Sequence, residues 1–370
     1  MAVGLVQRGE LAFEPGRPVS SREPGFPLFI AALYEAAGGR HAWLVLAAQA
    51  LMSLLIAAMI GALGGELFGP GVGAAAFAAY MLYPQSIYYS GWMFRDTFVS
   101  FLFTGAVWAT VRAARSGDGR FLAVAGASAA ALSITSTAAG LGAVPACALA
   151  LLISDRARGW RRAILFLLPV LVASGVWTAR NWRVQGRLVL GSTNGGPEIY
   201  QAMVVDANDL GTERQTELLN ADQTWNEISR LPEAERNAAM IRATMGIVRR
   251  SPGLYARRVA VRLIKFWRLW PYQRSYDESY RALFFISLIS DAWMVPLGLL
   301  GFVFLRRRWR DASAVWLSVI GLTGVFAALH AVIRYRLPLM GFVILSAVAA
   351  AAALRERLVG SLRAPRSSGA

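Results

Sequence analysis

The chain has 370 residues, of which 56% are hydrophobic and 16% charged, and its formal net charge is +16. Soluble domains carry about 45–50% apolar and about 25% charged residues, so this composition excludes an ordinary soluble enzyme. Many arginines stand in short loops between apolar blocks, where membrane orientation explains the positive charge better than a nucleic-acid partner does. The single cysteine, Cys147, excludes an internal disulfide and a Cys-based metal cluster. No cofactor or metal site is predicted, and a metal requirement stays open.

The apolar blocks predict about nine transmembrane helices. A block of roughly 20 residues can cross the hydrocarbon core, where only a helix satisfies its own backbone hydrogen bonds. The blocks are Ala42–Leu63, Val72–Ser90, Thr97–Ala114, Phe121–Ala139, Leu141–Ser154, Ala163–Ala179, Ala282–Leu305, Ala312–Ile333 and Leu337–Leu354. The predicted fold class is an all-α integral membrane protein with one mainly helical hydrophilic domain between the sixth and seventh helices.

Five regions follow along the chain. Residues 1–41 are predicted to form a partial first periplasmic loop with a juxtamembrane helix, and residues 42–180 hold the first six spans. Residues 181–281 form a periplasmic domain that ends in an amphipathic interfacial helix. Residues 282–354 hold the last three spans, and residues 355–370 form a basic cytoplasmic tail.

Short basic loops predict the orientation of the spans. The arginines concerned are Arg112, Arg115, Arg120, Arg156, Arg158, Arg161, Arg162, Arg306, Arg307, Arg308, Arg310, Arg355, Arg357, Arg363 and Arg366. With nine spans they all fall on one side, which the positive-inside rule makes cytoplasmic. We therefore expect a multi-pass protein of the bacterial inner membrane, with the large loop periplasmic and the C-terminus cytoplasmic. The same count leaves Met1–Arg40 outside with no span or signal peptide ahead of it, so either the count is off by one or a first helix is missing.

The large hydrophilic loop contains two predicted helices. Pro232 followed by two glutamates is typical of a helix start, and this helix would run toward Arg250. Ser251 and Pro252 start the next helix, in which basic residues recur at helical spacing among apolar and aromatic ones. This pattern is typical of a helix lying on the membrane surface, and equally of a helix packed inside the domain. Both alternatives stay open.

Polar residues gather at the outer ends of the spans, near one membrane depth in the predicted topology. They are Arg22, Arg95, Asp96, Arg180, Asn181, His330, Arg334 and Arg336. Arginines can hold a lipid-linked phosphate and stabilise its charge as it leaves, and a carboxylate can take a proton from an attacking hydroxyl. For each arginine, a contact with lipid headgroups or with a helix end remains the alternative. Asp291, within the seventh span, is expected to be satisfied by a neighbouring helix.

Four stretches spread over nearly the whole chain carry a family resemblance. They are Arg22–Phe29, with the pattern Arg-x-Pro-x-x-Pro-Leu, Tyr83–Thr97, Thr178–Gly196 and His330–Pro338, with the run Arg-Tyr-Arg-x-Pro. In order and spacing they resemble segments of the GT-C class of membrane glycosyltransferases. The nearest branch is that of the bacterial protein O-mannosyltransferases and aminoarabinose transferases.

The resemblance implies a polyprenyl-phosphate sugar as donor, a periplasmic acceptor hydroxyl and a carboxylate that acts as general base. Asp96 matches an acid of the second periplasmic loop and becomes the catalytic candidate. The candidates for binding the donor phosphate are Arg22, Arg95, Arg334 and Arg336, and the supporting residues are His330, Arg180 and Asn181.

The sequence departs from the family pattern in two places. The family's catalytic acid lies ahead of the Arg-x-Pro segment, yet no aspartate precedes Asp96 in this chain. Together with the topology count, this predicts that the chain begins late, inside the first periplasmic loop, and leaves the activity of this form open. Second, Ser133–Thr137 stands where the family often has Thr-Arg-Pro, so one phosphate-binding arginine is expected to be absent.

Two other functions compete with a glycosyltransferase. A non-catalytic transporter or assembly protein for envelope polysaccharide would consume no lipid-linked sugar, and Asp291 is its main support in the sequence. An O-antigen polymerase or ligase would also use lipid-linked sugars and periplasmic arginines. The large central loop of the chain is typical of such an enzyme, whereas the Arg22 segment is not.

Overall fold

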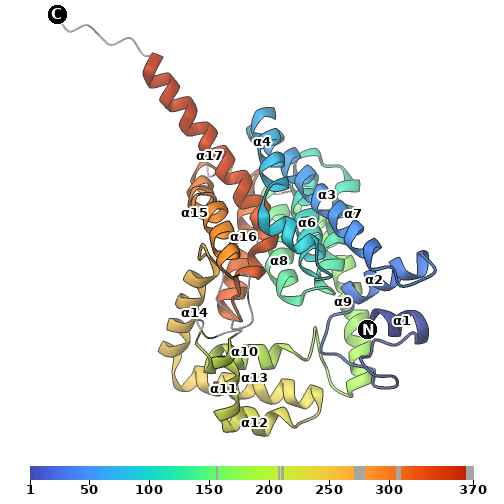
Figure 1. The fold of residues 1–370 in the computed structure, drawn as a ribbon. Coiled ribbons are helices and arrows are strands. Elements are labelled where there is room, and N and C mark those ends of the chain that lie inside the picture. Colours follow the sequence, from blue (N-terminus) through green and yellow to red (C-terminus); the bar gives the residue numbers. More distant parts are fainter. Residues whose placement is uncertain (156, 207–208, 210–211, 271–279, 306–309, 364–370) are drawn as a thin grey trace, which may run out of the picture.

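The structure is a computed structural model that describes the chain except residues 156, 207–208, 210–211, 271–279, 306–309 and 364–370 (Figure 1). Arg156, Arg306, Arg307, Arg308 and Arg366 of the predicted basic loops and tail lie outside the described residues. In chain order the elements are α1 (Ala2–Arg8), α2 (Gly25–Ala36), α3 (Ala42–Phe68), α4 (Pro70–Met81), α5 (Pro84–Ser90), α6 (Asp96–Ser116), α7 (Gly119–Ser133), α8 (Thr137–Ser154), α9 (Gly159–Gln185), α10 (Gly195–Val204), α11 (Glu213–Ala221), α12 (Gln223–Ser229), α13 (Glu233–Arg250), α14 (Pro252–Phe266), α15 (Tyr280–Leu305), α16 (Ser313–Ala328), the 3-10 turn η2 (Ile333–Arg336) and α17 (Leu337–Arg363).

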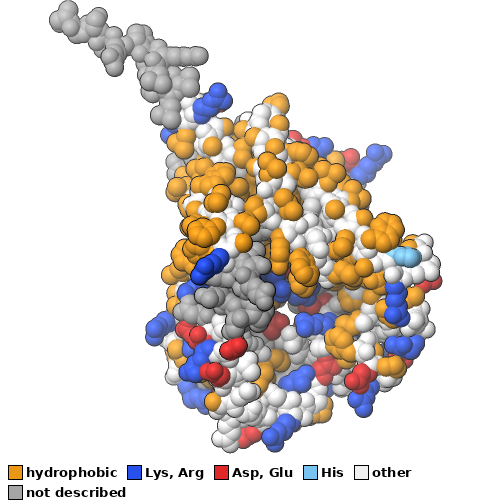
Figure 2. All heavy atoms as spheres, viewed as in Figure 1, with side chains coloured by type: hydrophobic (Ala, Val, Ile, Leu, Met, Phe, Trp, Pro, Cys, Tyr) orange, Lys and Arg blue, Asp and Glu red, His pale blue; other side chains and the backbone are white. Residues whose placement is uncertain are grey.

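The fold is an all-α integral membrane protein, as the composition predicts. Six helices of the described part, α3, α6, α8, α9, α15 and α17, are long and apolar enough to cross a bilayer. Three apolar helices, α2, α7 and α16, are shorter. Figure 2 shows apolar side chains covering the outside of the helix bundle, while charged side chains gather over the part that holds α10–α13.

The second predicted span, Val72–Ser90, is not one continuous helix. It consists of α4 and α5, separated at Leu82 and Tyr83. Tyr83 has an extended backbone with φ −70° and ψ 115°. The cause is Pro84, which disfavours helical geometry in the residue before it and has no N–H to continue the helix.

Small residues let two pairs of helices approach closely. The amide backbone of α16 at Leu322 lies so near Gly142 of α8 that an added Cβ would come within 2.7 Å of it. In α4, a Cβ on Gly73 would lie 2.5 Å from the carbonyl oxygen of Gly61 in α3. Helices in membranes commonly associate through such small residues, because lipid gives them no hydrophobic driving force.

The helices α10–α14 form a separate group at one end of the bundle (Figure 1). The two helix starts predicted in this region agree with the structure, where α13 begins at Glu233 and α14 at Pro252. The glutamates at the start of α13 lie near the positive end of its dipole, and its last turn holds Arg249 and Arg250.

The helix α14 packs against the protein on its basic face. Arg262 is 1% exposed and donates hydrogen bonds to the carbonyl oxygens of Ala327 and Ala202, at 2.7 and 2.8 Å. The ring of Phe266 is fully buried and stacks on Phe326 of α16, with 5.9 Å between the ring centroids. Ile264, on another face of α14, is 72% exposed. One face of the helix is thus packed inside the structure, as the second of the two alternatives predicts, and another face is exposed.

Candidate functional site

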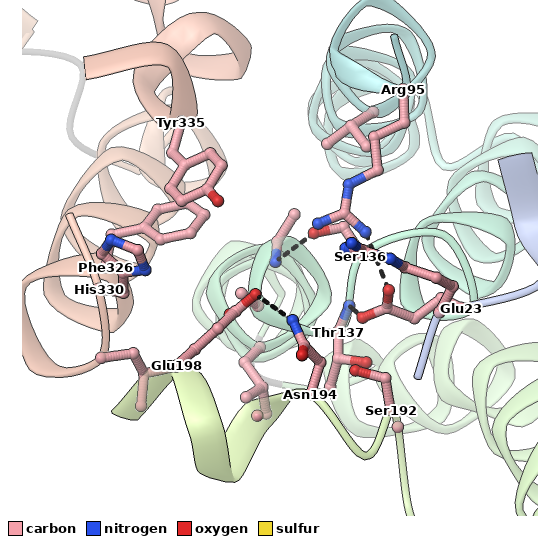
Figure 3. A pocket seen from close by; sticks show the side chains of 18 of the residues that line it. Glu23, Arg95, Ser136, Thr137, Ser192, Asn194, Glu198, Phe326, His330 and Tyr335 are labelled. Carbon is pink, nitrogen blue, oxygen red and sulfur yellow. Dashed lines mark hydrogen bonds and ion pairs between the residues drawn. The ribbon is translucent and has the colours of Figure 1, made fainter. Parts of the chain in front are cut away.

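A cavity of about 280 Å³ lies where the bundle meets the α10–α14 group. Figure 3 shows side chains from distant parts of the sequence converging on it. Its polar lining residues are Ser21, Arg22, Glu23, Arg95, Asp96, Ser136, Thr137, Ser192, Asn194, Glu198, His330, Arg334 and Tyr335, and its apolar ones include Val99, Leu141, Ile199, Phe326, Leu329 and Pro338. Five of the residues that the sequence selects therefore share one cavity: Arg22, Arg95, Asp96, His330 and Arg334.

Two arginines of the cavity form ion pairs with acids that line it. A guanidinium nitrogen of Arg95 lies 2.9 Å from a carboxylate oxygen of Glu23, and the two side chains are 36% and 10% exposed. Arg334 Nε lies 3.4 Å from an oxygen of Asp96, which follows Arg95 at the start of α6. Arg334 also lies over the rings of Phe94 and Tyr335, at 5.8 and 5.5 Å from their centroids. These contacts hold two positive charges at fixed places in a small cavity.

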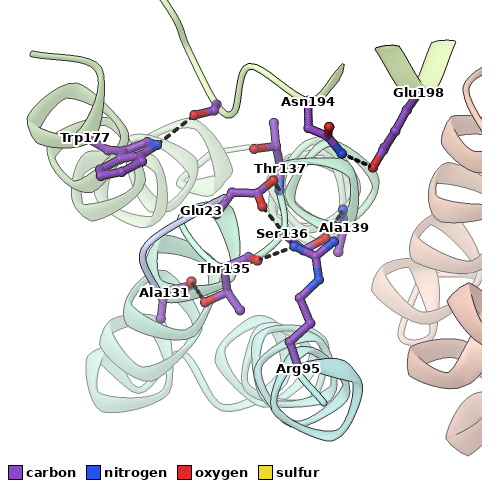
Figure 4. Close-up of polar contacts among 11 residues, drawn as sticks. Glu23, Arg95, Ala131, Thr135, Ser136, Thr137, Ala139, Trp177, Asn194 and Glu198 are labelled. Carbon is purple, nitrogen blue, oxygen red and sulfur yellow. Dashed lines mark hydrogen bonds and ion pairs between the residues drawn. The ribbon is translucent and has the colours of Figure 1, made fainter. Parts of the chain in front are cut away.

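The segment before α2 is bound to the turn between α7 and α8 (Figure 4). Glu23 accepts a hydrogen bond from the backbone N–H of Thr137, and Arg95 donates one to the carbonyl oxygen of Thr135 at 3.2 Å. The N–H of Gly25 donates to the carbonyl oxygen of Ile134 at 2.8 Å. A Cβ on Gly25 would lie 2.0 Å from Thr135 Oγ1, so only glycine fits this close approach. Through these contacts the backbone brings Arg22 and Glu23 to the cavity.

Arg22 and His330 line the cavity without polar partners in the described part of the chain. Arg22 is exposed, and no carboxylate among the described residues lies within 4.0 Å of its guanidinium. Neither ring nitrogen of His330 has a hydrogen-bond partner among the described residues. Burial lowers the pKa of His330 to about 4, with a further contribution from the positive charges of Arg262 and Arg334, so this imidazole is neutral at pH 7.

Arg336 is absent from the cavity lining, although it is two residues from Arg334. Its side chain is fully buried, pairs with Asp291 of α15 and donates a hydrogen bond to the carbonyl oxygen of Arg268 at 2.6 Å. Asp291 also accepts hydrogen bonds from Tyr83 and Gln85, at 3.0 and 2.8 Å. The expectation that a neighbouring element satisfies Asp291 agrees with this geometry. A phosphate role for Arg336 finds no support in it, because its guanidinium is buried and its contacts among the described residues are with other protein groups outside the cavity.

Arg180 and Asn181 lie beside the cavity and bind two segments of the chain next to it. Arg180 donates hydrogen bonds to the carbonyl oxygen of Val19 at 2.7 Å and to Ser20 Oγ at 3.1 Å. Asn181 is buried and donates to the carbonyl oxygens of Val189 and Gly191, at 3.2 and 3.1 Å. Arg180 therefore anchors the segment before Arg22, and Asn181 anchors the loop that leads into α10.

The sequence interpretation missed the acid on α10. Glu198 lines the cavity, half-buried, and accepts a hydrogen bond from Asn194 Nδ2 at 2.8 Å. It lies 102 residues from Asp96 in the chain and two residues beyond the stretch Thr178–Gly196 that carries the family resemblance. The Asn-Gly-Gly-Pro-Glu run at 194–198 was the signal available, because an acid in the first turn is typical of a helix start.

A family model described as dolichyl-phosphate-mannose-protein mannosyltransferase matches residues 19–182. Over these residues the match agrees with the resemblance to GT-C class membrane glycosyltransferases. The matched residues include Arg22, Glu23, Arg95 and Asp96, and they end within α9, ahead of the α10–α14 group. No curated protein sequence matches the chain.

Two solved structures are distantly similar. The archaeal oligosaccharyltransferase AglB from Archaeoglobus fulgidus, in complex with an inhibitory peptide and a dolichol-phosphate, has a TM-score of 0.48 and 12% identity over 95% of this chain and 45% of that one. ArnT from Cupriavidus metallidurans, bound to undecaprenyl phosphate, has a TM-score of 0.40 and 15% identity over 98% of this chain and 73% of that one. The chain thus spans less than half the length of AglB and about three quarters of ArnT.

Proposed function

We propose that the protein is a glycosyltransferase that moves a sugar from a polyprenyl-phosphate donor to an acceptor hydroxyl. The observation that carries this proposal is the cavity into which Arg22, Arg95 and Arg334 project beside apolar side chains. A phosphate joined to a prenyl chain needs both surfaces, since its charge requires cations and its first isoprene units require an apolar wall. The solved relatives with a bound dolichol-phosphate or undecaprenyl phosphate support this choice of donor.

The three arginines would act most strongly as the sugar leaves. Breaking the bond between the sugar and the phosphate places a second negative charge on the phosphate, and preorganised cations stabilise that charge. Arg22 has no carboxylate within 4.0 Å among the described residues, so its charge is the one most available to a phosphate. Asp96 is proposed to hold Arg334 in position, and the family resemblance also makes it a candidate for the general base.

The proposed setting is the inner membrane of a bacterium, with the cavity and the α10–α14 group on the periplasmic side. The acceptor would therefore be a cell-envelope glycan, lipid or protein that carries a free hydroxyl. The excess of arginine in the loops at the other end of the spans supports this orientation.

Binding of undecaprenyl phosphate to the full chain in detergent tests the proposal. We expect saturable binding by the native protein, and weaker binding by Arg22→Ala and Arg334→Ala by about 10- to 100-fold each, because a hydrogen bond to a charged group contributes about 1.5–3 kcal/mol. Arg214→Ala is the matched control, since Arg214 lies on α11 in an exposed ion pair with Glu217. Absence of binding by the native protein would contradict the proposed donor.

A further inference from the structure

Three carboxylates line the cavity, and they differ in how their charges are balanced. Glu23 lies against Arg95, and Asp96 lies against Arg334, in ion pairs of 2.9 and 3.4 Å. Glu198 lies within 4.0 Å of no arginine or lysine among the described residues. An adjacent positive charge stabilises the ionised form of a carboxylate and makes it a weaker base. By this criterion Glu198 is the one of the three whose charge is not balanced by an adjacent cation, which leaves it free to act as a base.

Glu198 is held so that one of its oxygens faces the cavity. It stands in the first turn of α10, and Asn194 Nδ2 donates to its Oε1 at 2.8 Å. Its Oε2 makes no hydrogen bond with the described part of the chain. Figure 3 shows the carboxyl group extending from α10 into the space between Arg95 and the aromatic side chains of Phe326 and Tyr335. The oxygen without a partner can therefore accept a hydrogen bond from a hydroxyl that enters the cavity.

We propose that Glu198 is the general base of the transfer, an inference that rests on the proposed function. The acceptor hydroxyl oxygen forms a bond to the anomeric carbon of the donor sugar, and the bond from that carbon to the phosphate oxygen breaks. The electron pair of the broken bond stays on the phosphate, beside the arginines. The proton of the acceptor hydroxyl passes to Glu198 and is later released to water, so charge and atoms balance.

The surroundings of Glu198 raise the pKa of its carboxyl group. Burial raises the pKa of its carboxyl, Arg95 opposes this increase, and the negative charge of Glu23 adds to it. A carboxyl with a raised pKa holds a transferred proton better at neutral pH, as general bases require. Because the group must be ionised to act, turnover is expected to fall as the pH decreases through this raised pKa.

The competing explanation is that Glu198 only stabilises the start of α10, where an acid in the first turn favours the helix dipole. Glu198→Gln separates the two roles. The amide oxygen can still accept the hydrogen bond from Asn194, but glutamine cannot take a proton. A purely structural role would leave turnover of this variant close to that of the native protein.

The test uses membrane vesicles that contain the full chain and the acceptors of the expressing bacterium. The donors are undecaprenyl phosphate carrying labelled mannose, glucose, galactose or aminoarabinose, and released undecaprenyl phosphate is measured. We expect Glu198→Gln to slow release by about 10²- to 10⁴-fold and Glu198→Asp to recover part of it. The acidic limb of the pH profile should disappear in Glu198→Gln. Glu227→Gln, on the exposed face of α12, is the matched control with unchanged release.

Binding of undecaprenyl phosphate alone separates this inference from the proposed function. We expect Glu198→Gln to bind this lipid as the native protein does, because Glu198 would contact the acceptor. The assignment is overturned, with the proposed function intact, if release by Glu198→Gln stays within threefold of native, if only Asp96→Asn slows release, or if Glu198→Gln loses lipid binding. If the native protein binds the lipid but releases none from any donor, the transfer step and the Glu198 assignment are both overturned, and only the lipid-binding part of the proposed function stands. Absence of both binding and release in the native protein overturns both.

Discussion

Arg334 and Arg336 belong to one short run, yet their surroundings differ completely. The 3-10 turn η2 directs Arg334 toward Asp96 and the cavity, and directs Arg336 into the bundle toward Asp291. Both partners of the second pair are 0% exposed. The buried charges of Arg336 and Asp291 stabilise each other, because a buried ion without a partner of opposite charge is strongly disfavoured. We infer that Arg336 fastens the start of α17 to α15.

Arg336→Met should destabilise the protein without removing a ligand for phosphate. Leaving Asp291 buried and unpaired is expected to lower the free energy of unfolding by about 3–5 kcal/mol, and adding Asp291→Asn should recover part of this loss. Unfolding in mixed micelles with increasing SDS measures both effects. If instead Arg336→Met leaves stability unchanged and abolishes binding of undecaprenyl phosphate, Arg336 is a phosphate ligand after all.

At the scale of elements, the cavity depends on chain segments that are tied to helix ends. The segment before α2 is bound to the turn between α7 and α8, and Glu233 of α13 accepts hydrogen bonds from the backbone N–H of Ser20 and from Thr193 Oγ1. Arg262 of α14 donates to two carbonyl oxygens at the end of α16, where the negative end of the helix dipole favours a cation. The α10–α14 group is thus joined to the bundle by polar contacts around the site.

Gly25→Ala should loosen the segment that carries Arg22. The added Cβ would collide with Thr135 and the carbonyl oxygen of Ile134, and overpacking of this kind typically costs about 1–3 kcal/mol. Gly119→Ala is the matched control, because Gly119 is also the first residue of a helix and a Cβ there meets nothing within 4 Å. The midpoint temperature of thermal unfolding should fall in Gly25→Ala, and this variant should bind undecaprenyl phosphate more weakly. Neither quantity should change in Gly119→Ala. Equal effects of the two substitutions would contradict the close contact between Gly25 and the turn before α8 as the cause.

At the scale of the molecule, the two ends of the bundle differ in chemistry. Asp96, at the start of α6, lines the cavity, while Arg115, near its end, pairs with Asp311 at 3.2 Å. A helix of 21 residues is about 30 Å long, which is the thickness of a hydrocarbon core. Arg162 lies beside Gly117, so segments of three basic loops meet at this second end. The cavity and these loops therefore lie at opposite ends of α6.

Cysteine labelling from one side of the membrane tests the orientation. Asn226→Cys, on exposed α12, should react with a membrane-impermeant maleimide in intact spheroplasts, and Ser116→Cys, at the far end of α6, only after permeabilisation. The native protein is the unlabelled control, because its Cys147 is buried. The opposite pattern of labelling would place the cavity in the cytoplasm and contradict a periplasmic acceptor.

The sequence by itself determined the fold class, the helix starts at Glu233 and Pro252, and the gathering of Arg22, Arg95, Asp96, His330 and Arg334. Apolar block length, charge in short loops and acids near helix starts are local signals, so they can be interpreted without coordinates. Only the tertiary structure decided that Arg336 leaves the cavity, that α14 buries Arg262, and that Glu198 enters the cavity from a distant helix. The physical reason is that the direction of a side chain, and the charge that lies opposite it, depend on which elements pack together.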